Sequence, residues 1–165
     1  MTSSWRVLAV DAGRLLTLCR RQGLRLATAE SCTGGLVAGV LTEIPGSSDV
    51  VERGYVTYSN TAKSELLGVR SVTLRRHGAV SEAAAREMAE GALRRARVDL
   101  AVSITGIAGP GGATPDKPVG LVHLACARRG RKTVHLREVF KGNRATIRRQ
   151  AVRAALQLCR RQALR

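Results

Sequence analysis

Serine and cysteine stand side by side in a stretch of small residues, Thr28 to Gly35, which reads TAESCTGG. Ser31 and Cys32 both carry side chains that serve as nucleophiles in covalent catalysis. The stretch follows a short apolar run that predicts a strand and precedes one that predicts a helix. The first N–H groups of a helix lack internal partners, so such a turn can bind a phosphate or an oxyanion. The alternative, equally open, is that Ser31 or Thr33 only caps the helix.

Two other predicted strands also end in residues capable of chemistry. One ends at Tyr58, with Lys63 about one helical turn further on, and another ends at Thr105, just before a glycine-rich loop. Ligands of open α/β sheets bind beyond the carboxyl ends of the strands. If these ends converge, Tyr58, Lys63 and Thr105 share a cleft with Ser31. Otherwise Tyr58 is a tyrosine at the edge of the core, and Lys63 is a solvated helix residue.

The glycine-rich loop, residues 106–112, matches neither of the common phosphate-binding patterns. No Gly-Lys-Ser/Thr closes it, as a Walker A loop requires, and its glycines do not fit GxGxxG. The loop is therefore either an ordinary connection or a surface where a ligand approaches the backbone closely, since glycine has no side chain to obstruct it.

Helices and strands alternate along the predicted chain. The predicted helices cover 11–22, 36–42, 61–67, 82–96 and 144–162, and the predicted strands cover 24–27, 54–58, 100–105, 119–127 and 133–140. Such alternation is typical of an α/β domain with helices on both faces of a sheet. The last two strands look like a hairpin, which predicts a mixed sheet. We therefore expect a single three-layer α/β/α domain over residues 1–165.

Cysteine and histidine spacing argues against a metal centre. The four cysteines form no CxxC pair and no Cys/His cluster, so a zinc site is not expected. Cys19 and Cys159 fall on apolar helix stripes and are predicted to lie in the core. His77, His123 and His135 are isolated from one another in the sequence, and none is predicted to bind a metal.

Length and hydropathy predict a protein without a membrane partner. The chain has 165 residues, of which 44% are hydrophobic, enough for one ordinary core. No apolar run approaches the roughly 20 residues that a membrane span needs. Residues 1–11 lack the long apolar region of a signal peptide. We expect a cytoplasmic protein.

The formal net charge of +16 raises the possibility of a polyanion partner. Aromatic residues, which stack on bases, make up only 2% of the chain, and the arginines are spread over several predicted helices. No recognised nucleic-acid motif is present. We therefore expect no specific nucleic-acid partner, although nonspecific binding at low salt is expected.

Four long runs together resemble one known family. They read TAESCTGGLVAGVLTEIPGSSDVV, GYVTYSNTAKSELLGV, HGAVSEAAAREMA and TGIAGPGGATPDKPVGLVHLA. In this order they are similar to the CinA C-terminal domain family, whose stand-alone members are nicotinamide-nucleotide amidohydrolases. The resemblance spans essentially the whole chain. It implies hydrolysis of nicotinamide mononucleotide (NMN) to nicotinate mononucleotide and ammonia, with no metal or cofactor, by a homodimeric protein.

The resemblance also implies site residues. The implied catalytic residues are Ser31 as nucleophile, Tyr58 and Lys63 as its activating groups, Thr105 and Arg144. The residues expected at the substrate are Cys32, Thr33, Gly34, Gly35, Gly106, Ile107, Ala108 and Gly109. Two positions depart from the family pattern: Asn143 replaces a common aspartate, and Ala113 replaces a common glycine. Asn143 can still cap a helix, but a contact that steers Arg144 is lost.

The implied chemistry requires a lysine with a lowered pKa. A serine hydroxyl needs a base to take its proton, and no histidine lies in these motifs. A free lysine has a pKa of about 10.4, whereas a catalytic one needs about 7–8, which burial and nearby positive charge can provide. Arg144 is the expected source of that charge. Backbone N–H groups around residues 32–35 are candidates for holding the oxyanion.

A second hypothesis stays open beside the enzyme. The basic charge, and the link of the wider family to competence, are also compatible with a catalytically silent protein that binds nucleotides or DNA. The presence of Ser31, Tyr58 and Lys63 together favours the enzyme, because a protein that only binds has no need of all three. Cys32 is expected to point away from the reacting group.

Overall fold

The computed structural model describes residues 4–165. Its helices are α1 (Trp5–Gln22), α2 (Leu36–Thr42), α3 (Asn60–Leu67), α4 (Ser71–His77), α5 (Glu82–Ala96) and α6 (Arg144–Ala163), with a short 3-10 helix at Ser47–Asp49. Its strands are β1 (Leu26–Glu30), β2 (Val51–Val56), β3 (Leu100–Gly106), β4 (Leu121–Arg128) and β5 (Val134–Val139). Residues 1–3, which belong to the segment that we expect not to be a signal peptide, lie outside the described residues.

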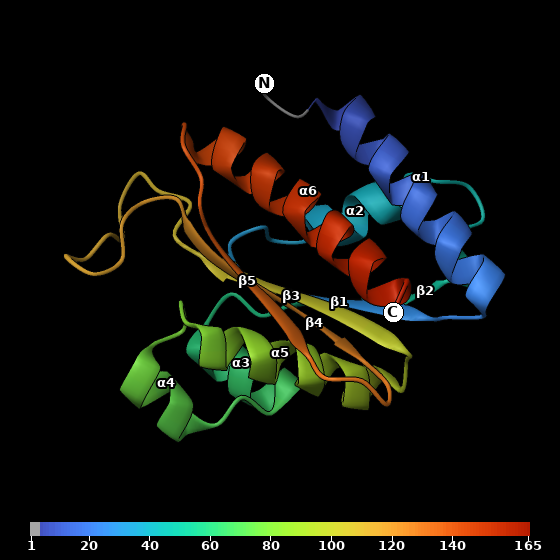
Figure 1. The fold of residues 1–165 in the computed structure, drawn as a ribbon. Helices are drawn as coiled ribbons and strands as arrows, with labels where there is room; N and C mark the ends of the chain where they lie inside the picture. Colours follow the sequence, from blue (N-terminus) through green and yellow to red (C-terminus); the bar gives the residue numbers. More distant parts are fainter. Residues whose placement is uncertain (1–3) are drawn as a thin grey trace.

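One mixed sheet separates two layers of helices. Its strand order is β2-β1-β3-β4-β5, and Figure 1 shows α1, α2 and α6 on one face, with α3, α4 and α5 on the other. This is the three-layer α/β/α arrangement that the alternating pattern predicts. The predicted hairpin is also confirmed, because β4 and β5 pair antiparallel.

The parallel half of the sheet brings the ends of three strands together. β1 pairs parallel with β2 on one side and with β3 on the other. In that register Glu30 lies opposite Val56 of β2 and Ile104 of β3. The residues that follow these three positions therefore emerge at the same edge of the sheet, as expected for carboxyl ends of parallel strands.

The two faces of the sheet are packed with side chains of different size. The face covered by α1, α2 and α6 carries the larger core, built mainly from leucine, valine and isoleucine. On the opposite face, Ala85 and Ala89 of α5 pack against Ala125 and Ala127 of β4. Small side chains there allow α5 to lie close to the sheet, which fixes the start of α5 beside the strand ends.

Several element boundaries differ from the prediction. Helix α1 starts at Trp5 rather than at residue 11, because Ser4 caps it by accepting a hydrogen bond from the Val7 N–H group. Strand β1 is displaced toward the motif and ends at Glu30, since even its polar residues are buried. Helix α4 was not predicted, because it is short and contains β-branched residues that weaken a helical pattern.

Candidate active site

A pocket of about 270 Å³ lies at the common edge where β1, β2 and β3 end. Its lining comes from loops and helix starts: Ser31, Cys32, Tyr58, Asn60, Lys63, Ala79, Val80, Thr105, Gly106, Ile107, Ala108, Gly109, Gly111, Gly112 and Arg144. The five residues expected to be catalytic thus meet in one pocket, although they are up to 113 positions apart in the chain (144 − 31). Its volume is close to the lower end of small-ligand sites, about 300 Å³.

Ser31 and Lys63 are in direct contact inside this pocket. The Lys63 ammonium nitrogen Nζ donates to Ser31 Oγ at 3.0 Å and to the Thr57 carbonyl at 2.7 Å. Lys63 is only 1% exposed. Helix α3 holds it there, because Ser59 caps the start of the helix and Gly68, with φ of 72°, ends it. A lysine buried against a serine is a suitable arrangement for taking the hydroxyl proton.

Burial is the physical cause that prepares Lys63 for this role. Removing the ammonium group from water disfavours its charged form and lowers the pKa of Lys63 from 10.5. Arg144, which we expected to supply nearby positive charge, instead bonds Tyr58 and Gly109. The expected direction of the pKa shift and the expected effect of burial are therefore right, whereas Arg144 is not among the causes of the shift.

Tyr58 and Arg144 form the outer wall of the pocket. The Arg144 guanidinium donates to the Tyr58 phenol oxygen at 3.0 Å and to the Gly109 carbonyl at 2.8 Å. Tyr58 is 62% exposed, so its ring borders the opening rather than the buried end. Asn143 caps α6 by accepting from the Thr146 N–H group at 2.9 Å, so the residue that departs from the family pattern keeps the capping role.

Thr105 and Gly106 mark the end of β3. The Thr105 hydroxyl donates to the Ala79 carbonyl at 2.8 Å and so ties the strand end to the loop before α5. A side chain at Gly106 would overlap Leu121 and Val122 of β4. Glycine is thus required there for packing of the hairpin against β3, besides any role in approaching a ligand.

Cys32 belongs to the core rather than to the reacting groups. It is 6% exposed and packs in the larger hydrophobic cluster. Burial raises the pKa of the Cys32 thiol to about 11. A thiol that stays protonated near neutral pH is a poor nucleophile. Cys19 and Cys159 are also buried, as their helix stripes predict.

The start of α2 differs from what the sequence suggested. Gly35 is the N-cap residue, with φ of 94°, and no side chain caps it from that position. Neither Ser31 nor Thr33 is the cap. Instead Glu30, which the sequence analysis did not single out, accepts hydrogen bonds from the Gly35, Val37 and Ala38 N–H groups. The only signal was an acidic residue shortly before a predicted helix.

The predicted substrate-binding residues divide into two groups. Cys32 and residues 106–109 line the pocket, whereas Thr33, Gly34 and Gly35 do not. The Gly34 N–H group donates to the Ser31 carbonyl and the Gly35 N–H group to Glu30, so neither is free for an oxyanion. Gly34 and Gly35 therefore shape the turn, and within the described residues the backbone N–H group of Thr33 has no such partner.

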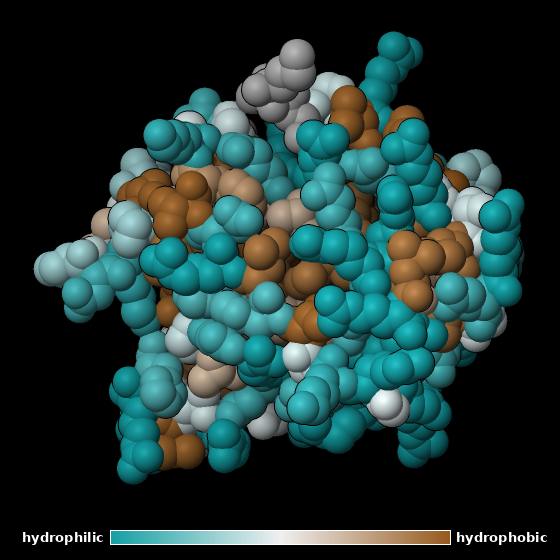
Figure 2. Space-filling model, in the orientation of Figure 1, coloured by the Kyte–Doolittle hydropathy of each residue, from teal (hydrophilic) through white to brown (hydrophobic). Residues whose placement is uncertain are grey.

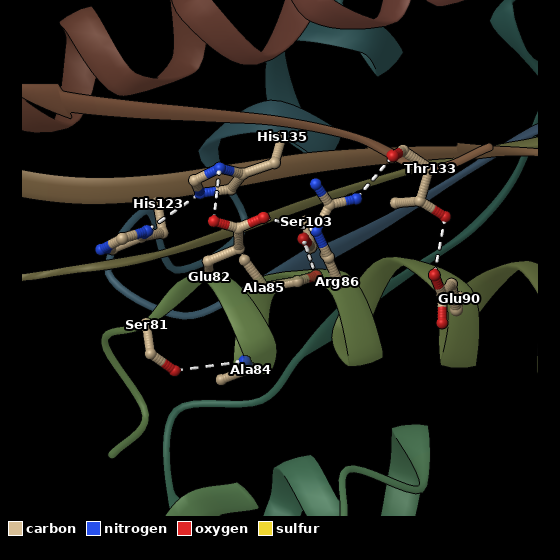
Figure 3. A network of polar contacts seen from close by, with 10 residues as sticks. All are labelled: Ser81, Glu82, Ala84, Ala85, Arg86, Glu90, Ser103, His123, Thr133 and His135. Atoms are coloured by element: carbon tan, nitrogen blue, oxygen red, sulfur yellow. Dashed lines mark hydrogen bonds and ion pairs between the residues drawn. The ribbon is translucent and has the colours of Figure 1, made fainter. Parts of the chain in front are cut away.

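Two histidines expected to be isolated are in contact. His123 of β4 and His135 of β5 stack with ring centroids 5.2 Å apart, and their ring nitrogens Nδ1 and Nε2 are 2.9 Å apart. Figure 3 shows His135 reaching on to Glu82 at the start of α5. Within residues 4–165, no group of three or more histidine, cysteine or acidic side chains is suited to a metal ion.

Comparisons with known proteins identify the family of the chain. The family model described as the CinA C-terminal domain matches residues 10–163. The chain belongs to this family. It is 55% identical to the nicotinamide-nucleotide amidohydrolase PncC of Escherichia coli over 138 residues, and these residues make up 84% of each protein. A CinA-like protein of Akkermansia muciniphila is 52% identical over 136 residues, which are 82% of this chain but 33% of that relative.

Solved structures of CinA proteins share the fold. The crystal structure of the competence/damage inducible protein CihA from Agrobacterium tumefaciens has a TM-score of 0.90 and 51% identity, and covers 92% of each chain. A CinA superfamily protein from Klebsiella pneumoniae has a TM-score of 0.91 at 37% identity, over 95% of this chain and 98% of the other.

In the described part of the chain, none of the helices has the length and apolarity needed to span a membrane.

Proposed function

We propose that residues 1–165 form an amidohydrolase domain that converts NMN and water to nicotinate mononucleotide and ammonia. The observation that carries this proposal is the 3.0 Å contact between Lys63 Nζ and Ser31 Oγ inside a pocket. The 55% identity to an amidohydrolase named for nicotinamide nucleotides gives the substrate class. Neither finding alone supports both the reaction and the substrate.

In the first half of the reaction, Ser31 Oγ attacks the carboxamide carbon and Lys63 takes the hydroxyl proton. The carbonyl oxygen becomes an oxyanion, which backbone N–H groups of the Ser31 turn stabilise. The C–N bond then breaks, and the departing nitrogen takes a proton to leave as ammonia. The product of this half is an ester between Ser31 and the nicotinoyl group.

In the second half, a water molecule attacks the ester with Lys63 as the base. The Ser31–acyl bond breaks, Ser31 recovers its proton from Lys63, and nicotinate mononucleotide leaves as a carboxylate after its acid proton passes to solvent. These steps use only side chains, backbone and water. One base serves both halves because it loses the proton at the end of the first half, to the leaving ammonia.

The other pocket residues have supporting roles in this proposal. Tyr58, held by Arg144, relays the proton to the leaving ammonia near the pocket opening. Thr105 orients the carboxamide. The glycine-rich loop, residues 106–112, approaches the ribose and phosphate. Arg144 contributes positive charge toward an anionic substrate while it keeps the loop in place through Gly109.

The direct test is ammonia release from NMN by the purified protein and by Ser31→Ala. We expect release by the first and loss of nearly all release by the second, with matching circular dichroism and unfolding curves. Release that survives in Ser31→Ala would remove Ser31 as nucleophile. No release from the unaltered protein would contradict the proposed substrate.

A competence-linked DNA-binding protein is the second candidate, favoured by the +16 charge. The face drawn in Figure 2 is largely hydrophilic, with apolar patches between the hydrophilic residues. Binding by charge alone weakens steeply with salt. Retention of DNA that disappears by about 0.15 M salt would show charge attraction only, whereas sequence-selective retention at that salt would support this candidate.

The biological setting follows from the same proposal. We also propose that the protein acts in pyridine-nucleotide salvage, in the cytoplasm, and as a homodimer. Val10 and Leu164 are exposed apolar side chains on α1 and near the end of α6 that a second copy could cover. Light scattering that gives a monomer mass across a wide concentration range would contradict the dimer.

A further inference from the structure

The N–H groups in the first turn of α2 are already occupied from inside the protein. Glu30, 0% exposed, accepts hydrogen bonds at 3.1 Å from both Gly35 and Val37, and at 2.9 Å from Ala38. A carboxylate at this end of a helix also complements its positive dipole. A substrate phosphate could bind the start of α2 only by displacing a buried carboxylate. A substrate phosphate is therefore expected to bind away from the start of α2.

Accounting for each N–H group in the turn leaves few for an oxyanion. The Ser31 N–H group donates to β3 at 2.9 Å, and the Gly34 N–H group donates back to the Ser31 carbonyl at 3.1 Å. The Leu36 N–H group donates to Thr33 at 3.3 Å. Within residues 4–165, only the N–H groups of Cys32 and Thr33 in this turn have neither a backbone acceptor nor Glu30. Of these two residues, Cys32 lines the pocket.

The carbonyl groups of the same turn are held from the other side. Arg148 of α6 donates to the Cys32 carbonyl at 3.1 Å and to the Thr33 carbonyl at 2.8 Å. Hydrogen bonds from a charged donor or to a charged acceptor are stronger than neutral ones. The turn that carries Ser31 is thus held by a carboxylate at its helical end and by a guanidinium on its carbonyls.

We infer that Glu30 is the positioning residue of Ser31: it anchors the start of α2, keeps Ser31 Oγ within reach of Lys63, and leaves the Cys32 N–H group as the oxyanion donor. This inference rests on the proposed role of Ser31 as nucleophile. Glu30 does not line the pocket, and within residues 4–165 it makes no hydrogen bond or ion pair with Lys63, so we expect it to act through the turn. A displacement of the turn by about 1 Å would lower the rate about 100-fold.

Glu30→Gln is the variant that tests this role. The amide keeps the size of the side chain but replaces one acceptor oxygen with an NH₂ donor. That donor would face either the Ala38 N–H group or the two N–H groups of Gly35 and Val37, so the anchor cannot stay complete. Glu43→Gln, an exposed change at the opposite end of α2, is the matched control.

The readouts are kcat and KM for NMN per active site, with active sites counted by covalent labelling of Ser31 with a fluorophosphonate. We expect Glu30→Gln to lower kcat per labelled site about 100-fold, with KM changed less than about threefold, and Glu43→Gln to match the unaltered protein. The rate constant of labelling should fall in parallel. An unchanged kcat per labelled site, with only fewer labelled molecules, would reduce Glu30 to a structural cap and overturn the inference.

Labelling separates this inference from the proposed function, because it needs no NMN. A protein that labels at Ser31 but leaves NMN intact contradicts the substrate, and the labelling rate of Glu30→Gln then decides the role of Glu30. A protein that neither labels nor hydrolyses NMN contradicts both. If Glu30→Gln fails to fold, Arg148→Met releases the same turn from α6. We expect Arg148→Met to lower kcat at constant KM. An unchanged kcat would overturn the inference that holding this turn positions Ser31.

Discussion

Replacing Lys63 with methionine separates catalysis from stability. Methionine keeps most of the side-chain volume but carries neither a base nor a charge. General-base catalysis is worth about 10²–10⁴ in rate, so we expect kcat to fall by at least about 100-fold. A lysine that only fills space or supports the fold would instead leave kcat of the folded protein nearly unchanged.

The structure predicts only a small change in stability for the same variant. The substitution leaves the Thr57 carbonyl without its 2.7 Å hydrogen bond, which costs about 1–3 kcal/mol. It also removes an amine whose lowered pKa shows that burial disfavours its charged form. These two effects oppose each other. We expect a net change within about 2 kcal/mol, or a shift in Tm below about 8 °C for a chain of this size.

The assay is ammonia release across about pH 6–10. Because burial lowers the pKa of Lys63 below 10.5, the neutral base forms at lower pH, and kcat/KM should rise with pH through that lowered value. The rise should vanish in Lys63→Met. Lys63→Arg, which keeps its charge at every accessible pH, should be equally inactive. Activity within about threefold of the unaltered protein, or the same rising limb in Lys63→Met, would refute Lys63 as the base.

Three further predictions follow from buried groups. Cys32→Ser should keep at least about a tenth of the turnover, unlike Ser31→Ala, and Cys32 should resist maleimide in the folded protein, because the pKa of its thiol is raised to about 11. The pKa of His123 is lowered to about 4, chiefly by burial. As the pH drops from 6.5 toward 4, the unfolded chain therefore takes up a proton at this histidine before the folded protein does. The free energy of unfolding should fall over this range by at most about 1.4 kcal/mol per pH unit. Urea unfolding of His123→Leu should show a weaker pH dependence, and an identical one would exclude His123 as the cause. Gly91→Ala should destabilise the protein by about 2 kcal/mol or more, because the added methyl group would overlap the Leu67 carbonyl. Gly13→Ala, with open space around the added methyl group, should stabilise the protein by about 0.5–1 kcal/mol. Denaturant midpoints that move in the same direction for both variants would contradict this difference.

The sequence predicted the candidate active-site pocket because several of its residues follow strand ends. Parallel strands place their carboxyl ends at one edge, so Ser31 and Thr105 had to lie close once β1 and β3 were neighbours. The contact between Ser31 and Lys63 needed more than this rule. It depends on the orientation of α3, which follows from the Ser59 cap and from packing against α5, and neither can be read from local periodicity.

The histidine pair shows where sequence patterns were insufficient. The hairpin of β4 and β5 was predicted, but its register was not. In the observed register His123 lies opposite Arg137, and His135 lies opposite Ala125, which makes the two histidines diagonal neighbours on one face. A shift by one residue would turn one of the rings to the other face. Their apparent isolation in the sequence therefore carried no information about their contact.

Glu30 was overlooked for a related reason. Strand interiors are expected to be apolar, and a buried acidic residue contradicts this expectation. The polar residues Thr28 and Glu30 therefore suggested a turn at positions where β1 in fact continues. The carboxylate is accommodated because α2 presents three N–H groups to it. These partners exist only after the chain has turned and begun the helix, and strand and helix propensities do not describe such a contact.

The alternation of side chains along β1 explains why Glu30 and Ser31 are consecutive. Successive residues of a strand point to opposite faces. Leu26 packs in the core on the α2 side of the sheet, whereas Ala27 and Ala29 pack on the side of α5. Glu30 continues the first series and reaches α2, and Ser31 follows the second and reaches Lys63 of α3. Because Glu30 and Ser31 reach opposite faces from consecutive positions, inserting one residue between them would turn Ser31 away from Lys63.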